Sequence, residues 1–212
     1  MPPPRVGVAF ISDRGDLHLP DCRASFREYV LPWLAAGGAD ISTKIVDDRA
    51  HELGMAGAVQ AAWSWALDEG VDYLLHVEED FRFAMDLDVL AMVRILRRSP
   101  YLAQLCLKRQ PWSPEERWAG DIFITWPTEG EERLQDREGF LVQRRLFSLN
   151  PCVIPARVLE LGWPSGPLGV GNEAGFTKRC VDAGLWFGYY GQRSDPPRVV
   201  HVGDTRAEGW RL

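Results

Sequence analysis

"VDYLLHVEEDFRF" (residues 71–83) opens with an apolar segment and runs into three consecutive acids, Glu78, Glu79 and Asp80. The apolar segment follows Gly70 and is nearly continuous, which predicts a strand that is buried on both faces, as in a parallel sheet. Adjacent carboxylates repel one another, so water or a bound cation must offset the repulsion. The stretch therefore predicts a strand whose carboxyl end is either a solvated loop or a cation site.

The sequence on either side of this stretch alternates between strand and helix patterns. We expect a first helix over 22–38, kinked or split at Pro32, with further helices over 55–70 and 87–98 and strands over 5–12, 40–48, 71–77 and 101–108. This alternation predicts an α/β fold with a Rossmann-like, mostly parallel sheet and helices on both of its faces.

Polar or acidic residues follow each of the first three expected strands. They are Ser12-Asp13-Arg14, Asp47-Asp48 and the three acids of the opening stretch. The carboxyl ends of parallel strands meet at one edge of the sheet, which is where such sheets bind ligands. We therefore expect these residues to form a single site.

Composition limits what else the chain can be. Its 212 residues, 46% of them hydrophobic, suffice for one core, and we expect a single domain over 1–212. A net charge of −6 disfavours binding of polyanions as the main task. Local basic clusters are expected to be solvated surface; they lie at Arg94, Arg97 and Arg98, at Lys108 and Arg109, and at Arg144 and Arg145.

The cysteine pattern and the hydropathy of the sequence indicate in which cellular compartment the protein is expected. The four cysteines are scattered without a zinc-site or disulfide pattern, as is typical of a reducing environment. "MPPPRVGVAFI" (1–11) lacks the apolar segment of a signal peptide, and no apolar run approaches the roughly 20 residues of a membrane span. We expect a soluble, cytoplasmic protein.

Four stretches, taken in order, resemble the nucleotide-sugar-dependent glycosyltransferases of the GT-A fold, most closely the inverting family-2 type. "STKIVDDRA" (42–50) is similar to the family's second strand, and 54–81 to the helix and strand that end in its metal-binding DxD motif. "SLNPCVIPARVLELGWP" (148–164) resembles the acceptor-side stretch, and "GNEAGFTKRCVDAG" (171–184) the segment that carries the catalytic base. The chain departs from the family in having Glu78 at the first DxD position and Arg49-Ala50 after the second strand.

The resemblance implies a Mn²⁺ or Mg²⁺ site for the diphosphate of the donor. Asp80 is the expected first ligand and Glu78 the second, because residues two apart in an extended strand share one side, whereas Glu79 points away. Many GT-A enzymes complete this shell with a C-terminal histidine, a role that falls here to His201 in the strand-like "RVVHVGD" (198–204).

The resemblance also assigns the remaining site residues. Glu173 becomes the general base that activates the acceptor hydroxyl, with inversion at the anomeric carbon. The expected donor is a UDP-sugar, and contacts to its nucleotide are expected from Ser12, Arg14, Asp47 or Asp48, Glu78, Lys178 and Arg179.

The resemblance further divides the chain into a nucleotide-binding half (1–109) and an acceptor-side half (110–212). In the second half, the tryptophan-rich stretch 110–139 offers ring faces for stacking a sugar or base. The acceptor stays open between a glycan and a hydroxymethylated DNA base, as does the oligomeric state. The same carboxylates would also suit a nucleotidyltransferase, a phosphohydrolase, or a non-catalytic module that binds nucleotide or metal.

Overall fold

The structure is a computed structural model that describes the chain except residues 1, 14, 16, 110–132, 165–170 and 204–212. Two parts of the expected site, Arg14 and residues 110–132 of the tryptophan-rich stretch with the expected strand "DIFITW" (121–126), therefore lie outside the described residues.

The first half of the chain follows the expected strand and helix alternation. Its elements are β1 (Arg5–Ser12), α1 (Leu19–Tyr29), α2 (Leu31–Ala36), β2 (Asp40–Asp47), α3 (Gly54–Asp68), β3 (Tyr73–Glu78), β4 (Phe81–Phe83), α4 (Val89–Arg98) and β5 (Leu102–Cys106). The expected first helix is split at Val30, and Pro32 lies in the first turn of the second piece, where its missing N–H leaves no hydrogen bond unmade.

The second half adds shorter elements, most of which the sequence patterns did not predict. They are β6 (Gln135–Arg137), β7 (Phe140–Gln143), β8 (Cys152–Pro155), α6 (Ala156–Leu159), α7 (Gly171–Asp182), β9 (Trp186–Tyr190) and β10 (Val199–His201).

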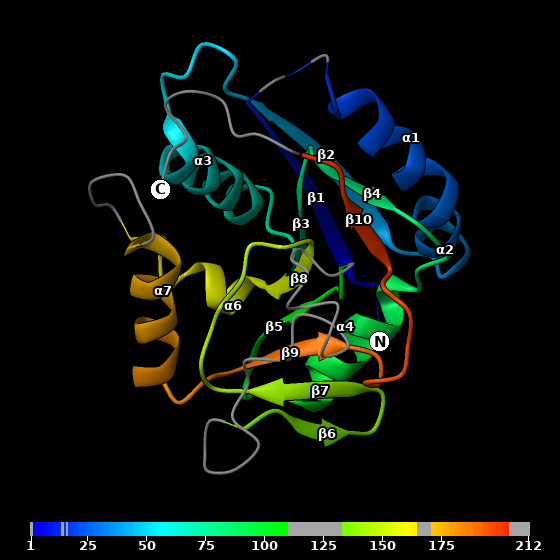
Figure 1. Cartoon of the computed structure of the whole chain (residues 1–212), viewed down its shortest axis with the longest axis vertical. Coiled ribbons are helices and arrows are strands. Elements are labelled where there is room, and N and C mark those ends of the chain that lie inside the picture. The colour runs from blue at the N-terminus through cyan, green and yellow to red at the C-terminus, as the bar shows by residue number, and fades with distance from the viewer. Residues whose placement is uncertain (1, 14, 16, 110–132, 165–170, 204–212) are drawn as a thin grey trace.

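In the described part of the chain, eight strands form one mixed sheet in the order β2-β1-β3-β8-β5-β9-β7-β6 (Figure 1). The pairings of β1 with β2 and β3, and of β5 with β9, are parallel. The short strand β8 lies between β3 and β5 and is antiparallel to both, and β7 is antiparallel to β6 and β9. Because only β7 and β8 run against the others, the expectation of a mostly parallel sheet is confirmed.

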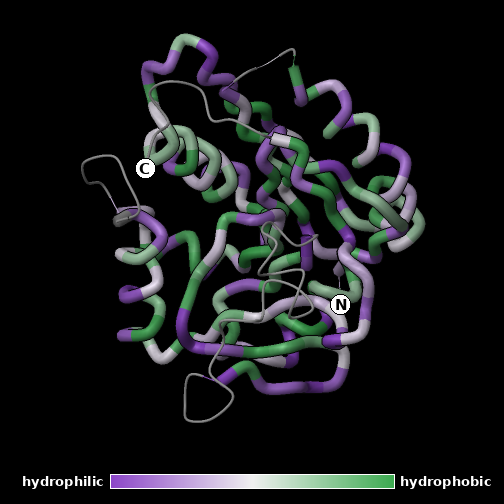
Figure 2. Tube along the Cα trace, in the orientation of Figure 1, coloured by the Kyte–Doolittle hydropathy of each residue, from purple (hydrophilic) through white to green (hydrophobic). Residues whose placement is uncertain are grey.

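Helices cover both faces of this sheet. Alternate side chains of β1 point to opposite faces: Val6 and Val8 pack with α1, α2 and α4, whereas Ala9 and Ile11 pack with α3, α6 and α7. Figure 2 shows the corresponding concentration of hydrophobic residues along the central strands. The sheet is therefore buried on both faces, and its ligand-binding surface is left to the strand ends.

A second, two-stranded sheet lies beside the carboxyl end of β3. In it β10 runs antiparallel to β4, the strand that directly follows the three acids. This pairing places His201 opposite Phe81, although the two are 120 positions apart in the sequence. No helix in the described part of the chain is long and apolar enough to cross a bilayer.

Candidate active site

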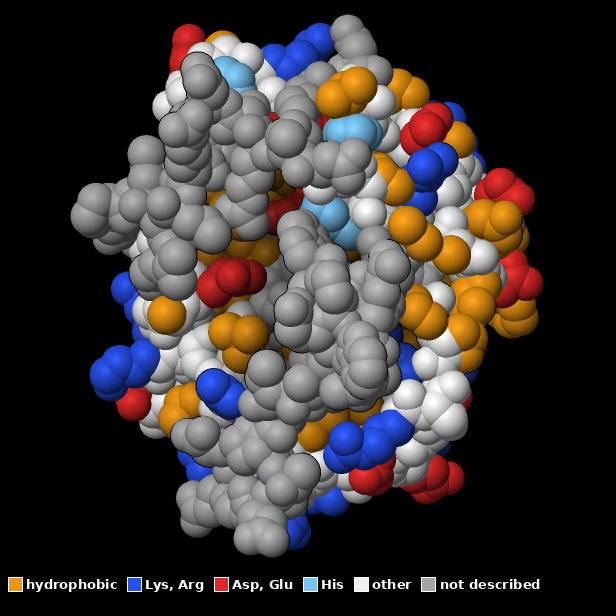
Figure 3. All heavy atoms as spheres, viewed as in Figure 1, with side chains coloured by type: hydrophobic (Ala, Val, Ile, Leu, Met, Phe, Trp, Pro, Cys, Tyr) orange, Lys and Arg blue, Asp and Glu red, His pale blue; other side chains and the backbone are white. Residues whose placement is uncertain are grey.

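The carboxyl ends of the first three strands meet at one edge of the sheet. Ser12 lies opposite Asp47, and Ile11 lies opposite Glu78. The ladder continues past the strands, since Asp48 N donates to the Ser12 carbonyl at 2.7 Å and Glu79 N donates to the Ile11 carbonyl at 2.9 Å. Figure 3 shows acidic and histidine side chains near the middle of the corresponding face. The structure thus brings together the strand ends that the sequence predicted to form one site.

Asp80 and His201 form the charged centre of this site. Nε2 of His201 lies 3.1 Å from Oδ2 of Asp80, and the two side chains are only 12% and 15% exposed. The His201 ring is fixed edge-on against Phe81, with 4.8 Å between ring centroids, and Val202 N donates to the Asp80 carbonyl at 2.7 Å. The β4–β10 pairing therefore positions both side chains through the backbone.

Gly203 gives this carboxylate its room. A Cβ at position 203 would lie 2.5 Å from Oδ2 of Asp80 and 3.0 Å from its Cβ. Any side chain at position 203 would push the Asp80 carboxylate away from His201. Glycine at this position therefore allows the two side chains to approach each other.

Glu79 turns away from this centre, toward β1. It is 2% exposed; its Oε2 accepts from the Ser12 hydroxyl at 2.6 Å, and its Oε1 accepts from Asp13 N at 3.2 Å. The Ser12 hydroxyl in turn accepts from Gly15 N at 2.9 Å. Glu79 and Ser12 therefore hold the loop after β1 against the end of β3, and the Ser12 hydroxyl is engaged in hydrogen bonds inside the protein.

Glu78 and Asp80 do not share a side by strand alternation, because β3 ends at Glu78 and residues 79–80 form a turn. The pKa of the buried Cys152 thiol is raised well above its usual value by burial first, then by Cys106, and then by the charges of Glu78 and Glu173. Glu78 and Glu173 therefore both contribute negative charge to the part of the sheet around Cys152.

Glu173 lies in the first turn of α7, where the helix dipole favours a carboxylate. Its Oε1 accepts from Leu149 N at 2.8 Å, which ties α7 to the segment before β8. Thr177 adds a second tie, since its hydroxyl donates to the Glu173 carbonyl at 2.7 Å and accepts from Phe147 N at 2.9 Å. The carboxylate is partly exposed, so it is both positioned and accessible.

The two acids at the end of β2 have different environments. Asp47 is chelated by Arg49, whose Nε donates to both carboxylate oxygens at 2.9 and 2.8 Å, and this hydrogen bonding lowers the pKa of Asp47. Asp48 is 2% exposed, and its Oδ1 accepts from Leu53 N at 2.9 Å. Its Oδ2 is buried and meets no donor within the described ranges. Asp48 therefore has a carboxylate oxygen that can accept a hydrogen bond from a ligand, whereas both carboxylate oxygens of Asp47 accept from Arg49.

Lys178 and Arg179 are not brought to the site. Nζ of Lys178 lies 2.6 Å from Asp182 at the far end of α7, on an exposed face. Nη1 of Arg179 donates to the carbonyls of Leu161 and Gly162 at 3.1 and 2.8 Å. Asp182 is nine residues beyond Glu173, or roughly 13 Å along the helix axis. These contacts hold both cations away from Glu173.

The described residues of this site offer two protein ligands to a hard divalent cation. Within the ranges described, no three His, Cys, Asp or Glu side chains are arranged to hold a metal ion. The pair Asp80 and His201 nevertheless supplies one carboxylate and one imidazole, and Mg²⁺ and Mn²⁺ sites commonly combine one or two protein ligands with phosphate and water. Asp80 and His201 therefore fit a coordination shell whose remaining ligands would come from a diphosphate and water. Glu78 does not join them as a third ligand in the structure.

Lys108 is a buried residue that supports the site, although the sequence pattern predicted it at the surface. It was expected on a solvated surface with Arg109, and that expectation is wrong, since the two are 1% and 8% exposed. The Lys108 ammonium donates to the carbonyls of Gln192 and Arg193 at 2.6 and 3.2 Å, and also to that of Asp195. Its own carbonyl accepts from Arg198 N at 2.9 Å. Lys108 thus fixes the segment that leads into β10 and so to His201.

His76 lies beneath the site, in the middle of β3. It is fully buried, and neither ring nitrogen has a hydrogen-bond partner in the described part of the chain. Burial lowers its pKa from 6.5 to about 4. A neutral imidazole is thus retained in the core over a wide pH range.

We expect acid to destabilise the protein through this residue. The unfolded chain takes up the proton near pH 6.5 but the folded chain only near pH 4, so stability falls as the pH decreases through this window, by roughly 3 kcal/mol in total. Urea unfolding of the parent and of His76→Leu between pH 7.5 and 4.5 measures the difference. An equally steep fall in the variant would contradict the assignment.

Comparison with known proteins shows similarity in structure alone. No protein-family model matches the sequence, and no curated protein shows significant sequence similarity to it. Residues 1–349 of TarS from S. aureus align with a TM-score of 0.58 at 12% identity, covering 93% of this chain and 60% of that one. The catalytic domain of Drosophila beta1,4-galactosyltransferase 7, in complex with xylobiose, aligns with a TM-score of 0.54 at 12% identity, covering 94% of this chain and 71% of that one.

These likenesses show that the chain has the GT-A-like fold that its sequence resemblance implied. The chain spans 60% of the length of the TarS fragment. The same fragment in complex with UDP aligns with a TM-score of 0.56 at 14% identity, covering 92% of this chain and 60% of that one.

Proposed function

We propose that this chain is a metal-dependent glycosyltransferase that moves a sugar from a nucleoside-diphosphate donor, UDP-linked, to an acceptor hydroxyl with inversion. The observation that carries the proposal is the Asp80–His201 pair, held at 3.1 Å at the carboxyl end of β3 on a GT-A-like fold. Two of the solved neighbours were studied with a uridine nucleotide, TarS with UDP and a mutant of the Drosophila galactosyltransferase with manganese and the sugar donor UDP-Gal.

Asp80 and His201 would hold the cation, and a cation bound there would neutralise the charge that develops on the departing diphosphate. The turn 79–80 carries the carboxylate, while the β10 backbone and Phe81 fix the imidazole. Both ligands are thus positioned before any substrate arrives, as catalysis by charge stabilisation requires.

The nucleoside is assigned to the end of β2. The buried Oδ2 of Asp48 is an acceptor that lacks a donor in the described part of the protein, and such an atom destabilises the fold by about 1–3 kcal/mol unless a ligand supplies the hydrogen bond. A base N–H or a ribose hydroxyl would satisfy it. We therefore assign nucleoside recognition to Asp48, with Asp47 serving to anchor Arg49.

We assign to Glu173 the role of the general base that activates the acceptor hydroxyl. Its Oε1 is held by Leu149 N, which leaves the carboxylate oriented while part of it stays exposed. From there it would take the proton of an acceptor hydroxyl as that oxygen attacks the anomeric carbon on the face opposite the leaving diphosphate. The acceptor class we favour is a glycan, since xylobiose occupies the Drosophila neighbour.

A thermal-shift titration with UDP, with and without Mn²⁺, tests this proposal. We expect UDP to raise the melting temperature only when Mn²⁺ is present, because the diphosphate completes the shell of the cation. Asp48→Asn is expected to weaken UDP binding about tenfold or more, since its amide replaces the Oδ2 acceptor with a donor. Asp47→Asn is the matched control and should leave binding within about twofold. No effect of any nucleotide, or equal effects of the two variants, would contradict the assignment.

A further inference from the structure

Gln104 is a polar residue in the middle of an apolar strand, β5. It is 1% exposed, and its neighbours Ala103 and Leu105 are fully buried, so both ends of its amide need hydrogen-bond partners inside the protein. The backbone of Ser148 supplies them. With the amide oriented so that both ends find a partner, Nε2 donates to the Ser148 carbonyl at 2.9 Å and Oε1 accepts from Ser148 N at 3.0 Å. Gln104 thus clamps the backbone of residue 148 with two hydrogen bonds.

The clamped carbonyl belongs to the same peptide group as Leu149 N, which donates to Oε1 of Glu173 at 2.8 Å. A peptide group is planar, and in its trans form the C=O and the N–H point in opposite directions. Gln104 and Glu173 therefore hold the two ends of one rigid unit. A carbonyl that Gln104 fixes also fixes the direction of the N–H that meets the carboxylate.

Two thiols add to the hold on this carbonyl. Cys106 and Cys152 are directly opposite each other on β5 and β8, and their Sγ atoms lie 3.4 and 3.8 Å from the Ser148 oxygen. Both are fully buried, and burial raises the pKa of Cys152, so its S–H is retained as a donor at neutral pH. Donors on a carbonyl polarise the peptide group and strengthen its N–H as a donor. Groups from β5 and β8 thus both position and polarise the peptide that contacts Glu173.

We propose that Gln104 is a positioning residue for Glu173 and acts through the Ser148–Leu149 peptide. This inference rests on the proposed role of Glu173 as the general base, and Gln104 itself, buried in β5, touches no substrate. A general base must lie within hydrogen-bond reach of the proton that it takes, and a misplacement of about 1 Å lowers rates about 10²-fold. Without the clamp the peptide can rotate, and Leu149 N–H then no longer holds the carboxylate in one position.

Gln143 of β7 offers a matched control. It is fully buried, and its amide clamps a neighbouring turn in the same manner, since Nε2 donates to the Leu146 carbonyl at 2.7 Å and Oε1 accepts from Leu146 N at 2.9 Å. The N–H of that peptide, Phe147 N, donates to the Thr177 hydroxyl and not to a carboxylate. Methionine at position 104 or 143 keeps the length of the side chain and removes both hydrogen bonds. The two variants therefore lose the same kind of clamp and differ in what the clamped peptide holds.

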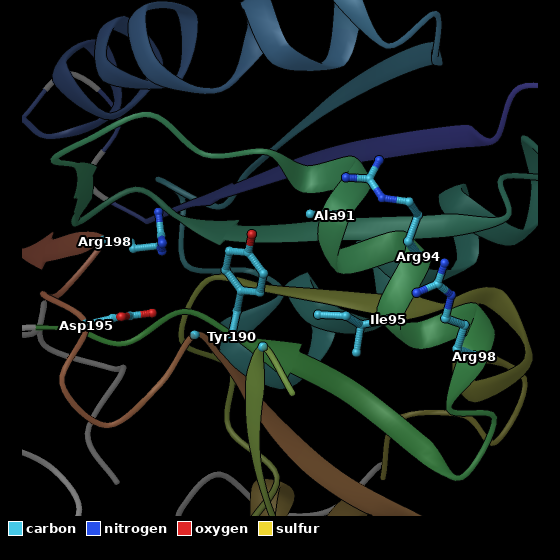
Figure 4. A pocket seen from close by; sticks show the side chains of 9 residues that line it. Ala91, Arg94, Ile95, Arg98, Tyr190, Asp195 and Arg198 are labelled. Carbon is cyan, nitrogen blue, oxygen red and sulfur yellow. The ribbon is translucent and has the colours of Figure 1, made fainter. Parts of the chain in front are cut away.

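A second control lies on the other face of the sheet. Cys106 packs on the face that α3 and α7 cover, whereas Tyr190 packs on the face that α4 covers. There Tyr190 lines a cavity of about 320 Å³ between α4 and the segment 191–198 (Figure 4), whose lining contains neither Gln104 nor Ser148. Tyr190→Phe removes one hydroxyl from this cavity and leaves the clamp intact.

Amide hydrogen exchange and kinetics test the inference together. Relative to the amides of β1, we expect Leu149 N–H to exchange at least about tenfold faster in Gln104→Met than in the parent, because its hydrogen bond is no longer fixed. We expect kcat to fall about 10- to 100-fold with unchanged affinity for UDP, and this fall to vanish in a Glu173→Gln background. Gln143→Met and Tyr190→Phe should stay within about twofold of the parent in both measurements. Gln104→Asn, whose shorter amide cannot reach both groups of residue 148, is measured in the same way should Gln104→Met not fold.

Parental exchange of Leu149 N–H in the position-104 variant would overturn the inference, whether or not the parent transfers sugar. A loss of kcat that persists in the Glu173→Gln background, or an equal loss in Gln143→Met, would overturn it as well. If exchange of Leu149 N–H quickens but the parent transfers no sugar, the clamp on the peptide is supported and the proposed function alone fails. The two failures are therefore distinguishable.

Discussion

Asp80→Asn is expected to lower glycosyl transfer at least about 100-fold and to abolish the Mn²⁺-dependent stabilisation by UDP. The substitution keeps the size of the side chain and its backbone contacts but removes the charge that lies 3.1 Å from His201. Loss of a direct ligand should exceed the 10- to 100-fold effects typical of residues that only orient ligands. Initial rates and a Mn²⁺ titration followed by melting temperature measure the two consequences separately.

Asp72→Asn is the matched control for this variant. Asp72 precedes β3 at the opposite edge of the sheet, and its Oδ2 accepts from Arg5 N at 2.8 Å, a bond that an asparagine oxygen can also accept. Its activity and Mn²⁺ response should match those of the parent. Full activity of Asp80→Asn, or equal losses in both variants, would rule out Asp80 as the cation ligand.

Glu173→Gln is expected to reduce kcat by about 10²–10⁴ while leaving the affinity for UDP unchanged. The amide oxygen of glutamine can still accept from Leu149 N, so the tie between α7 and the segment before β8 is kept. What is lost is the ability to take a proton from the acceptor hydroxyl. Separate measurement of kcat and of UDP binding distinguishes this loss from a structural one.

Glu160→Gln provides the control here, since Glu160 lies at the exposed end of α6 and should give parental kcat. If Glu173→Gln retained parental kcat, the carboxylate would serve only to join α7 to the core. If the parent itself transferred no sugar yet bound UDP with Mn²⁺, the chain would be a binding module on the same fold.

The strand ends were predictable because they depend on local patterns. Apolar runs that stop at acids predicted β1, β2 and β3, and the right-handed parallel connection then aligned Ser12, Asp47 and Glu78 at one edge. The resemblance to GT-A enzymes added Asp80 and His201, and the structure brings these two together.

The remaining features depend on contacts between distant residues. β8 has four residues and gives no sign in the sequence that it pairs between β3 and β5. Strand alternation failed at Asp80 because the chain turns at Glu79, whose burial against Ser12 no period-two pattern encodes. Lys108 looked like surface, and only the carbonyls of the 192–195 turn show why an ammonium is buried there.

The position of β8 also governs when the sheet can be completed during synthesis. The strands on either side of it end at Glu78 and Cys106, but β8 itself emerges only after residue 152, and β9 follows later still. Until then the nascent chain exposes the unpaired edges of β3 and β5, which are hydrophobic and prone to pair with other chains. The ribosome must therefore release most of the polypeptide before its first half can close, and such non-local pairing makes folding slow.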